Sequence, residues 1–323
     1  MLTNKTNIPL SIAVWLAHDN YDYVIDPNYI SATSLLKPIR SIVLGRSMAI
    51  EDDTDIADLV PSRIGTAVHE QIEYAWADVV RPSALRALGY PETLINSVVI
   101  NPEPGTDLEG KTPVYLEIRK TKQLGKWKIG GKFDFVAEGT LTDFKTTKTY
   151  SFISGSNEDG YMKQGSIYKW LNPDIITNDV MNIGYIFTDW IAMKALQDKN
   201  YPQTNIVEKK LPLMKEDAIE TFILHVLSKI ERYTGAPQKD MPLCTKDELW
   251  QRDSVWKYFK DPAKRSRSTK NFDNPGDANQ RNASDGSKGI VVEVAGEVKR
   301  CNYCNARPIC LQADQLKRDG LLK

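Results

Sequence analysis

Apolar residues recur at helical spacing in several separate segments of the chain. The two longest amphipathic stripes lie at residues 61–80 and 219–233, where apolar side chains fall three or four positions apart. Gly235 follows the second stripe, and glycine often ends a helix. Shorter helices are predicted where similar spacing or a capping residue occurs, at residues 31–36, 83–88, 91–97 and 161–171.

Segments with strand character occupy the middle of the chain and recur near its end. Strands are expected at residues 114–120, 126–136, 140–145, 181–193, 206–213 and 290–294. Glu138-Gly139 separates the second strand from the third and predicts a β-hairpin, while residues 206–213 are expected to form an edge strand. Residues 271–289 are rich in Asn, Asp, Ser and Gly, which predicts a flexible loop.

The predicted hairpin carries ionisable side chains in a pattern that suits metal-assisted chemistry. Asp134 lies on the first strand, whereas Asp143 and Lys145 lie two residues apart on the second and therefore share a face. Two neighbouring carboxylates repel each other unless a cation lies between them, and Mg²⁺ prefers oxygen ligands, so the Phe144 carbonyl is a further candidate. Lys145 could then orient or deprotonate an attacking water. The alternative is an ordinary surface hairpin with an Asp143–Lys145 ion pair.

Two helices flank the hairpin in sequence and carry further candidate residues. His69 falls one position off the apolar stripe of residues 61–80, and its alternative is a buried, hydrogen-bonded histidine. Gln164 and Tyr168 are four residues apart on one helix face, where they could contact a phosphate or simply pack. Glu117, on the strand before the hairpin, is an additional candidate ligand for a metal or water.

The order Gly-x-x-x-His, a strand with Asp, Asp-x-Lys and Gln-x-x-x-Tyr resembles the RecB-like branch of the PD-(D/E)XK nuclease superfamily over residues 29–171. The resemblance implies an α/β fold with a restriction-endonuclease-like core, a mixed central sheet flanked by helices. It implies a ligand set for Mg²⁺ or Mn²⁺ made of His69, Asp134, Asp143 and the Phe144 carbonyl. The catalytic set it implies is Lys145 with Asp134, Asp143, Gln164 and Tyr168.

The chain has four cysteines, and the last three form a C-x-x-C-x-x-x-x-x-C pattern. Four thiols can hold one zinc ion or one iron–sulfur cluster, and free or disulfide-linked thiols are the remaining alternative. The pattern resembles AddB-type and CRISPR-associated RecB-like exonucleases, which implies a [4Fe–4S] cluster. In those families the fourth cysteine precedes the nuclease motifs, where residues 34–40 here contain none, so Cys244 would have to join Cys301, Cys304 and Cys310.

Composition limits the class of protein without deciding it. Charged residues make up 26% and hydrophobic residues 41% of the 323 residues, values that exclude wholesale disorder. The 42 basic residues equal the 42 acidic ones, so a nucleic-acid enzyme would have to concentrate its positive charge locally. Residues 252–270 combine basic and aromatic side chains and are a candidate DNA contact, or else a solvated helix with aromatic residues in the core.

No stretch of the sequence is long and apolar enough to cross a membrane. Residues 8–17 are apolar, but Pro9 interrupts them and no cleavage site follows, which favours a core strand or helix of a cytoplasmic protein. The chain is expected to divide into a lead-in at 1–60, a nuclease core at 61–240 and a cysteine-cluster module at 241–323. The lack of a helicase domain suits a phage or mobile-element protein working in the host cytoplasm.

Taken with the motifs, the resemblance implies a divalent-metal-dependent DNA nuclease with a structural [4Fe–4S] cluster. An exonuclease acting in recombination, repair or phage genome processing is favoured, on single- or double-stranded DNA ends. A recombination protein and a second copy of the chain are the candidate protein partners. The alternative is a catalytically silent nuclease-fold protein that binds DNA or assists assembly and is stabilised by zinc.

Overall fold

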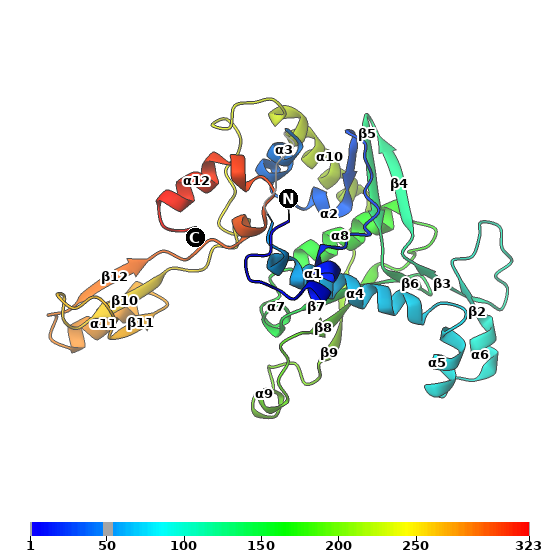
Figure 1. Ribbon diagram of the computed structural model, residues 1–323, viewed down its shortest axis with the longest axis horizontal. Helices are drawn as coiled ribbons and strands as arrows, with labels where there is room; N and C mark the ends of the chain where they lie inside the picture. The colour runs from blue at the N-terminus through cyan, green and yellow to red at the C-terminus, as the bar shows by residue number, and fades with distance from the viewer. Residues whose placement is uncertain (1, 48–53, 323) are drawn as a thin grey trace. The chain divides into compact units, whose positions relative to one another are not determined.

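The computed structural model describes residues 2–47 and 54–322, which divide into two units (Figure 1). The first unit comprises Met1–Leu36 and Asp52–Leu227, and the second comprises Lys37–Glu51 and Ser228–Lys323. The second unit therefore includes a piece of chain that lies, in sequence, between the two segments of the first unit. Among the described residues, no helix has the length and apolar character needed to span a membrane.

A mixed six-stranded sheet with helices beside it forms the body of the first unit, as an α/β fold requires. Its order is β2-β3-β6-β7-β8-β9, with parallel pairing of β2 with β3 and of β7 with β8, and antiparallel pairing elsewhere. The expected edge strand is confirmed, because β9 pairs with β8 alone in this order. The strands are β2 (Val98–Ile100), β3 (Thr112–Leu116), β6 (Phe135–Ala137), β7 (Thr140–Thr147), β8 (Val180–Phe187) and β9 (Ile206–Pro212).

The predicted hairpin is the β6–β7 pair. Glu138 and Gly139 form its turn with φ angles of 49° and 74°, the left-handed backbone that a two-residue type I′ turn needs. Phe135, the first residue of β6, pairs with Thr142, so Asp134 lies one residue before the paired part of the strand. In the first half of β7, half-buried and buried positions alternate, and Asp143 is one of the buried ones.

A second sheet in the first unit has the order β1-β5-β4, with β1 (Tyr29–Ser31), β4 (Arg119–Leu124) and β5 (Trp127–Lys132). The strands expected at 114–120 and 126–136 each break once, at Glu117 and at Asp134. One half of each belongs to the six-stranded sheet and the other half to this three-stranded sheet. The backbone at Glu117 is left-handed, with φ of 52°, which an extended strand cannot continue.

Two helices of the first unit position the candidate residues. Helix α4 (Val60–Ala75) packs on β7 and begins with proline in its first turn, where the missing N–H costs nothing. Helix α8 (Glu158–Leu171) buries an apolar stripe against β5 and β8. The remaining helical segments of this unit are α1 (Leu10–Ala17), α2 (Ala32–Leu35), α5 (Arg81–Ala87), α6 (Glu92–Ser97), α7 (Thr149–Ser154), α9 (Ala192–Gln197) and the 3₁₀ turn Ile56–Leu59.

Most predicted helices are confirmed within a few residues, including the short one that Ser31 caps by accepting from Ser34 N–H at 3.1 Å. The apolar segment 8–17, expected as a core element, is the helix α1, yet Leu16 is its single buried residue. The apolar composition of this segment therefore does not correspond to a buried helix in the described part of the chain. Helix α10 (Glu216–Tyr233) reproduces the longest predicted amphipathic helix and continues from the first unit into the second.

The second unit contains a small antiparallel sheet of order β11-β10-β12 and several short helices. Tyr258 and Phe259 are buried in β10, so these aromatic residues of the basic segment 252–270 belong to a core strand and do not face solvent. The elements are α3 (Ile39–Ser47), β10 (Val255–Phe259), β11 (Lys270–Phe272), α11 (Pro275–Ser284), β12 (Ile290–Val294), α12 (Leu311–Arg318) and the 3₁₀ turns Arg300–Tyr303 and Arg307–Ile309.

The prediction of a flexible loop at 271–289 is wrong, because the helix α11 occupies about half of this segment. Asn274 caps the helix by accepting from Asp277 N–H at 2.9 Å, and Pro275 occupies its first turn. Ala278 is its buried residue, and the helix packs on all three strands of the small sheet. The polar composition favoured a loop, although the start signals of a helix were present in the sequence.

Gly131 on β5 lets α8 approach the sheet closely. A methyl carbon at this position would lie 2.7 Å from Tyr168 Cε1 and 3.2 Å from Leu171 Cδ1.

We expect Gly131→Ala to lower the free energy of unfolding by about 1–3 kcal/mol, because overpacking forces the ring or the strand to shift. Gly65→Ala is the matched control, since nothing lies within 4 Å of its added carbon in α4. It should be neutral or stabilise by about 0.5–1 kcal/mol in urea titrations. Equal midpoints for the two variants would contradict the close contact.

Candidate metal centre and catalytic cluster

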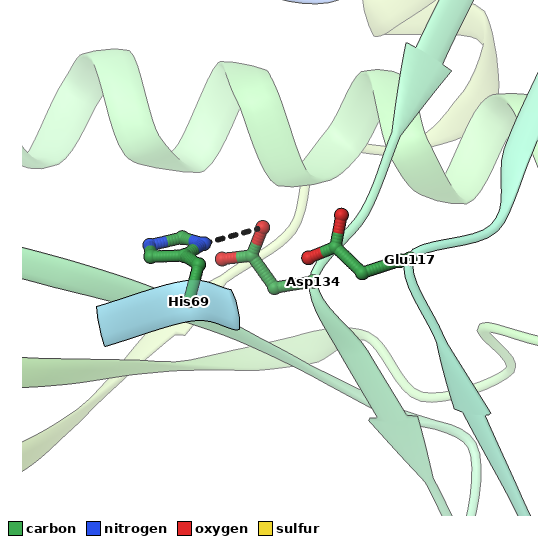
Figure 2. A group of neighbouring side chains, drawn as sticks. All are labelled: His69, Glu117 and Asp134. Atoms are coloured by element: carbon green, nitrogen blue, oxygen red, sulfur yellow. Dashed lines mark ion pairs between the residues drawn. The ribbon is translucent and has the colours of Figure 1, made fainter. Parts of the chain in front are cut away.

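Three side chains from different elements converge at the break between the two sheets of the first unit (Figure 2). His69 comes from α4, Glu117 from the end of β3, and Asp134 from the junction of β5 and β6. One potential ligand atom of each lies within 4.8 Å of the other two, and no other such group occurs among the described histidines, cysteines and acidic residues. One imidazole and two carboxylates are a suitable donor set for a divalent cation.

His69 is oriented by a backbone contact on one side and a carboxylate on the other. Its Nε2 lies 3.0 Å from the Phe144 carbonyl oxygen, and its Nδ1 lies 3.5 Å from Asp134 Oδ1. In the Nε2–H tautomer the ring donates to the carbonyl and directs the Nδ1 lone pair toward the carboxylates, as metal-bound histidines do. Burial lowers the pKa of His69, but Asp134, Asp143 and the Phe144 carbonyl together outweigh burial, and the net pKa is raised.

An aromatic row holds α4 in place over the hairpin. The His69 and Phe144 rings meet edge to face, with their centroids 6.0 Å apart. The ring centroids of Phe144 and Phe135 lie 6.3 Å apart, and those of Phe135 and Trp76 lie 5.0 Å apart. His69 and Trp76 lie seven residues apart on or just after the same helix, so both ends of this row fix the helix against β6 and β7.

The two carboxylates of the trio are held by backbone and charge contacts. Asp134 Oδ2 accepts from the Phe144 N–H at 2.8 Å, which ties the carboxylate to β7. Glu117 N–H donates to the Asp134 carbonyl at 3.1 Å, and its carboxylate forms an ion pair with Lys132. Burial raises the pKa of Glu117 above its ordinary value despite that lysine. A cation between these oxygens would relieve their mutual repulsion.

A second polar cluster lies on the other face of β7 and reaches α8. Lys145 Nζ lies 2.5 Å from Asp143 Oδ2 and donates to Gln164 Oε1 at 3.3 Å. Gln164 Nε2 in turn donates to the Tyr168 hydroxyl at 2.8 Å. The chain Asp143–Lys145–Gln164–Tyr168 therefore connects the strand with the helix through every polar group that the sequence singled out there. The Tyr161 ring adds a cation–π contact, its centroid 5.0 Å from Lys145 Nζ.

Burial controls the protonation of this cluster. Loss of water around Asp143 raises its pKa to about 6, even though the Lys145 ammonium opposes that effect. Burial lowers the pKa of Lys145, but Asp143 outweighs it and the net pKa is raised, so the amine stays charged. Burial also raises the pKa of Tyr168 well above its ordinary value, which keeps the phenol protonated. The buried Asp143 Oδ2 therefore has the Lys145 ammonium as its charged partner.

The structure brings together most of the predicted site, in two groups. His69 and Asp134 lie in the compact trio, whereas Asp143 lies with Lys145, and its predicted role as a metal ligand stays a prediction. The Phe144 carbonyl contacts the imidazole, which leaves its second lone pair for the ligand role that the resemblance implies. Glu117 was weighed only as an extra ligand. Its place beside Asp134 depends on the strand break, which the local sequence does not reveal.

The four cysteines line one cavity of the second unit, with an empty volume of about 310 Å³ including its open mouth. Cys244 therefore joins Cys301, Cys304 and Cys310, although 57 residues separate it from the first of them (301 minus 244). All four are unpaired thiols in this structure. Burial raises the pKa of the Cys244 thiol to about 12, with the neighbouring cysteines adding to the effect.

Side chains from α3 and α12 fix the cysteine-bearing segments. Arg40 donates from Nη1 to the carbonyls of Met241 and Pro242, which shapes the chain just before Cys244. Gln312 exchanges two hydrogen bonds with the Cys244 backbone, at 2.8 and 3.0 Å. Helix α3 begins in the segment 34–40, where the resemblance noted in the sequence would place a fourth cysteine, and it lines the same cavity.

Comparisons with known proteins give distant likenesses of fold. No family model and no curated protein match this sequence. Among solved structures, the protein SSO0001 matches with 15% identity and a TM-score of 0.37 over 68% of this chain and 85% of that chain. A candidate exonuclease from Eubacterium rectale matches with 12% identity and a TM-score of 0.36 over 65% of this chain and 83% of its own.

A phage-related exonuclease from Haemophilus somnus 129PT has 15% identity and a TM-score of 0.27 over 40% of this chain. The match spans 63% of that exonuclease. At these identities and TM-scores the likenesses carry no functional argument, so the function has to be inferred from the geometry of the site.

The trio should bind a divalent cation in the absence of any substrate. We expect Mn²⁺ to bind with one site per chain, and Asp134→Asn to weaken it about tenfold or more, because an anionic ligand becomes a neutral amide. Asp159→Asn is the charge-matched control, since Asp159 is an exposed partner of Lys163 on α8. Isothermal titration calorimetry measures both. Unchanged Mn²⁺ affinity in Asp134→Asn, or an equal loss in Asp159→Asn, would contradict the site.

Proposed function

We propose that this protein is a divalent-metal-dependent DNA nuclease that hydrolyses phosphodiester bonds. The observation that carries the proposal is the adjacency, across one strand, of a compact His69–Glu117–Asp134 donor set and a buried lysine on β7. Metal-binding oxygens and a fixed ammonium beside them are what phosphoryl chemistry requires, because negative charge develops on the phosphate oxygens during attack.

His69, Glu117 and Asp134 would hold Mg²⁺ or Mn²⁺, and the electrostatic interaction of Asp143 with both His69 and Asp134 supports the predicted fourth contribution from that residue. Such a cation, when bound, would polarise the scissile phosphate and lower the pKa of a bound water. The donor set suits this group: two carboxylates and one imidazole leave coordination positions for water and substrate.

Lys145 acts as a fixed donor in this proposal. Because its pKa is raised, the amine stays protonated and stabilises charge on the phosphoryl oxygens or orients the attacking water. Asp143 and Gln164 determine the position of its Nζ atom. Tyr168 accepts from Gln164 Nε2 and so fixes which end of that amide faces the lysine.

The substrate and role follow from the resemblance noted in the sequence, and they form the finer part of the proposal. We assign DNA ends as the substrate and exonucleolytic cleavage as the reaction, in recombination, repair or phage genome processing. A cytoplasmic location, a recombination protein as partner and a homo-oligomer belong to the same proposal. The second candidate function is a silent DNA-binding or assembly protein, which would keep the fold without cleaving.

We further propose that the four cysteines hold a [4Fe–4S] cluster with a structural role. Across the described residues, which include all four cysteines, no three sulfur atoms lie within 4.8 Å of one another. One zinc ion at about 2.3 Å from each sulfur would require sulfur separations of about 3.8 Å. The shared cavity supports one common site for the four thiols, the resemblance implies a multi-iron cluster there, and zinc remains the second candidate.

Lys145→Met should reduce Mg²⁺-dependent cleavage of linear DNA by about 10²–10³-fold, because the charge that stabilises the phosphoryl oxygens is lost. Lys163→Met is the matched control on α8, where Lys163 pairs with an exposed carboxylate, and it should keep normal activity. End-labelled linear DNA and circular DNA are digested in parallel. Circular DNA should resist an exonuclease. Full activity of Lys145→Met would reject the proposed role of this lysine.

Protein purified without oxygen should be brown, with about four iron and four sulfide per chain, if the cluster is present. Cys244→Ser should lose most of the iron, because a ligand of the cluster is removed. Ser268→Ala, outside the cavity, should keep it. Metal analysis and visible absorption measure both. A colourless protein with one zinc per chain would replace the cluster with the zinc site, and one without either metal would reject both.

A further inference from the structure

We infer that the outer face of the three-stranded sheet β1-β5-β4 binds the unpaired strand of a DNA end and directs it to the candidate metal centre. This inference rests on the proposed function, whose substrate it specifies. The face is defined by the pairing register. Arg119 lies opposite Lys132 in the ladder, so both project to one side, while Gly131 lies against Tyr168 of α8 on the other. Lys128, four residues before Lys132, projects to the same side as Arg119.

Positive charge is concentrated in this hairpin. Residues 119–132 contain six basic residues and no acidic residue, in a chain whose net charge is zero. Phosphate neutralisation supplies most of the affinity in sequence-independent DNA binding, so an island of this kind is a natural place for a backbone contact. Arg119, Lys128 and Lys132 project to the proposed face, whereas Lys120 and Lys122 project to the α8 side and Lys126 lies in the turn between β4 and β5.

Aromatic rings lie against the same face and are open to solvent. The side chains of Tyr21 and Tyr23 are 52% and 65% exposed, and their ring centroids lie 4.8 Å apart. The Arg119 guanidinium carbon is 5.8 Å from the Tyr21 centroid. Gly130 makes room for the Tyr29 ring, since a methyl carbon there would lie 2.3 Å from Tyr29 Cε2. Rings and guanidinium planes of this kind stack on unpaired bases, which a duplex does not offer.

The two basic strands lead directly into the metal centre. Arg119 follows Glu117 by two residues, and Lys132 precedes Asp134 by two residues and pairs with Glu117. A backbone that contacts the basic residues therefore continues toward the carboxylates at the strand break. Single-stranded DNA is the ligand that uses both features, the cations for its phosphates and the tyrosines for its bases.

The segment that carries the tyrosines also carries carboxylates on the same cations. Asp22 Oδ2 lies 3.4 Å from Arg119 Nε, and Asp26 Oδ2 lies 3.6 Å from Lys128 Nζ. The Asp22 side chain is 82% exposed, and ion pairs of that kind contribute little to stability. DNA phosphates can therefore replace both carboxylates, which makes the acidic residues competitors of the DNA. Their removal should strengthen binding, an effect that a purely structural role does not predict.

The test is binding of fluorescent dT20 and of a 20-base-pair duplex in EDTA, so that cleavage does not interfere. We expect the double variant Tyr21→Ala/Tyr23→Ala to bind dT20 about tenfold more weakly, with little change for the duplex. The double variant Tyr21→Phe/Tyr23→Phe should bind as the unchanged protein does, because the rings remain. Tyr90→Ala is the control, since Tyr90 is 49% exposed between α5 and α6 and should have no effect.

The charge variants give the second arm. Arg119→Gln should lower the slope of log affinity against log salt by about 0.7, the value for one phosphate contact on a single strand. Asp22→Asn/Asp26→Asn should bind dT20 more tightly than the unchanged protein. Asp179→Asn, an exposed residue between α8 and β8, controls for charge and should cause little change.

Unchanged dT20 binding in Tyr21→Ala/Tyr23→Ala, weaker binding in Asp22→Asn/Asp26→Asn, or preference for the duplex would overturn the inference. Failure here differs from failure of the proposed function. A protein that cleaves DNA normally with the tyrosines removed loses only this binding face. A protein that binds dT20 through the tyrosines but cleaves nothing loses only the nuclease proposal.

Discussion

One backbone hydrogen bond lies at the point on which the site depends. Glu117 N–H donates to the Asp134 carbonyl at 3.1 Å, where two neighbouring strands break together and pass from one sheet to the other. Continuous strands would alternate their side chains regularly between two faces. The break, with its left-handed Glu117, instead brings the two carboxylates within reach of His69. Backbone strain of this kind is expected where a structure fixes functional groups.

The charged side chains form two groups beside β7 that also interact with each other, because Asp143 has electrostatic interactions with both His69 and Asp134. On one side the acidic trio has excess negative charge, which a cation can neutralise. On the other side Asp143 and Lys145 neutralise each other in a buried pair, and Gln164 takes a further hydrogen of the ammonium. A buried lysine without such partners would lose its proton. The Asp143 carboxylate therefore keeps the Lys145 amine protonated, and the proposed phosphoryl chemistry requires that positive charge.

The sequence predicted the elements with strong local signals and missed those set by distant contacts. The hairpin followed from Glu138-Gly139, and both φ angles agree with that reading. The break at Glu117 was not predicted, because its φ depends on the pairing with Asp134, which no local pattern encodes. Helix α11 was missed since polar composition outweighed the Asn274-Pro275 start signal. The placement of Cys244 beside the other cysteines was not predictable locally, because it depends on long-range hydrogen bonds. Gln312 contacts Cys244 across 68 residues, and Arg40 contacts Met241 across 201 residues.

The glycines of β5 explain how one strand serves both proposed tasks. Gly131 faces α8, and the missing side chain lets Tyr168 lie close to the strand beside the Gln164–Lys145 network. Gly130 faces the opposite side, where the missing side chain lets Tyr29 lie along the basic face. Glycine weakens a strand, so two in succession are unfavourable unless both faces need close packing. Here each face carries a tyrosine, and the strand that connects them ends beside Asp134. The two glycines thus place the proposed DNA-binding face and the Gln164–Lys145 network on opposite sides of the same strand.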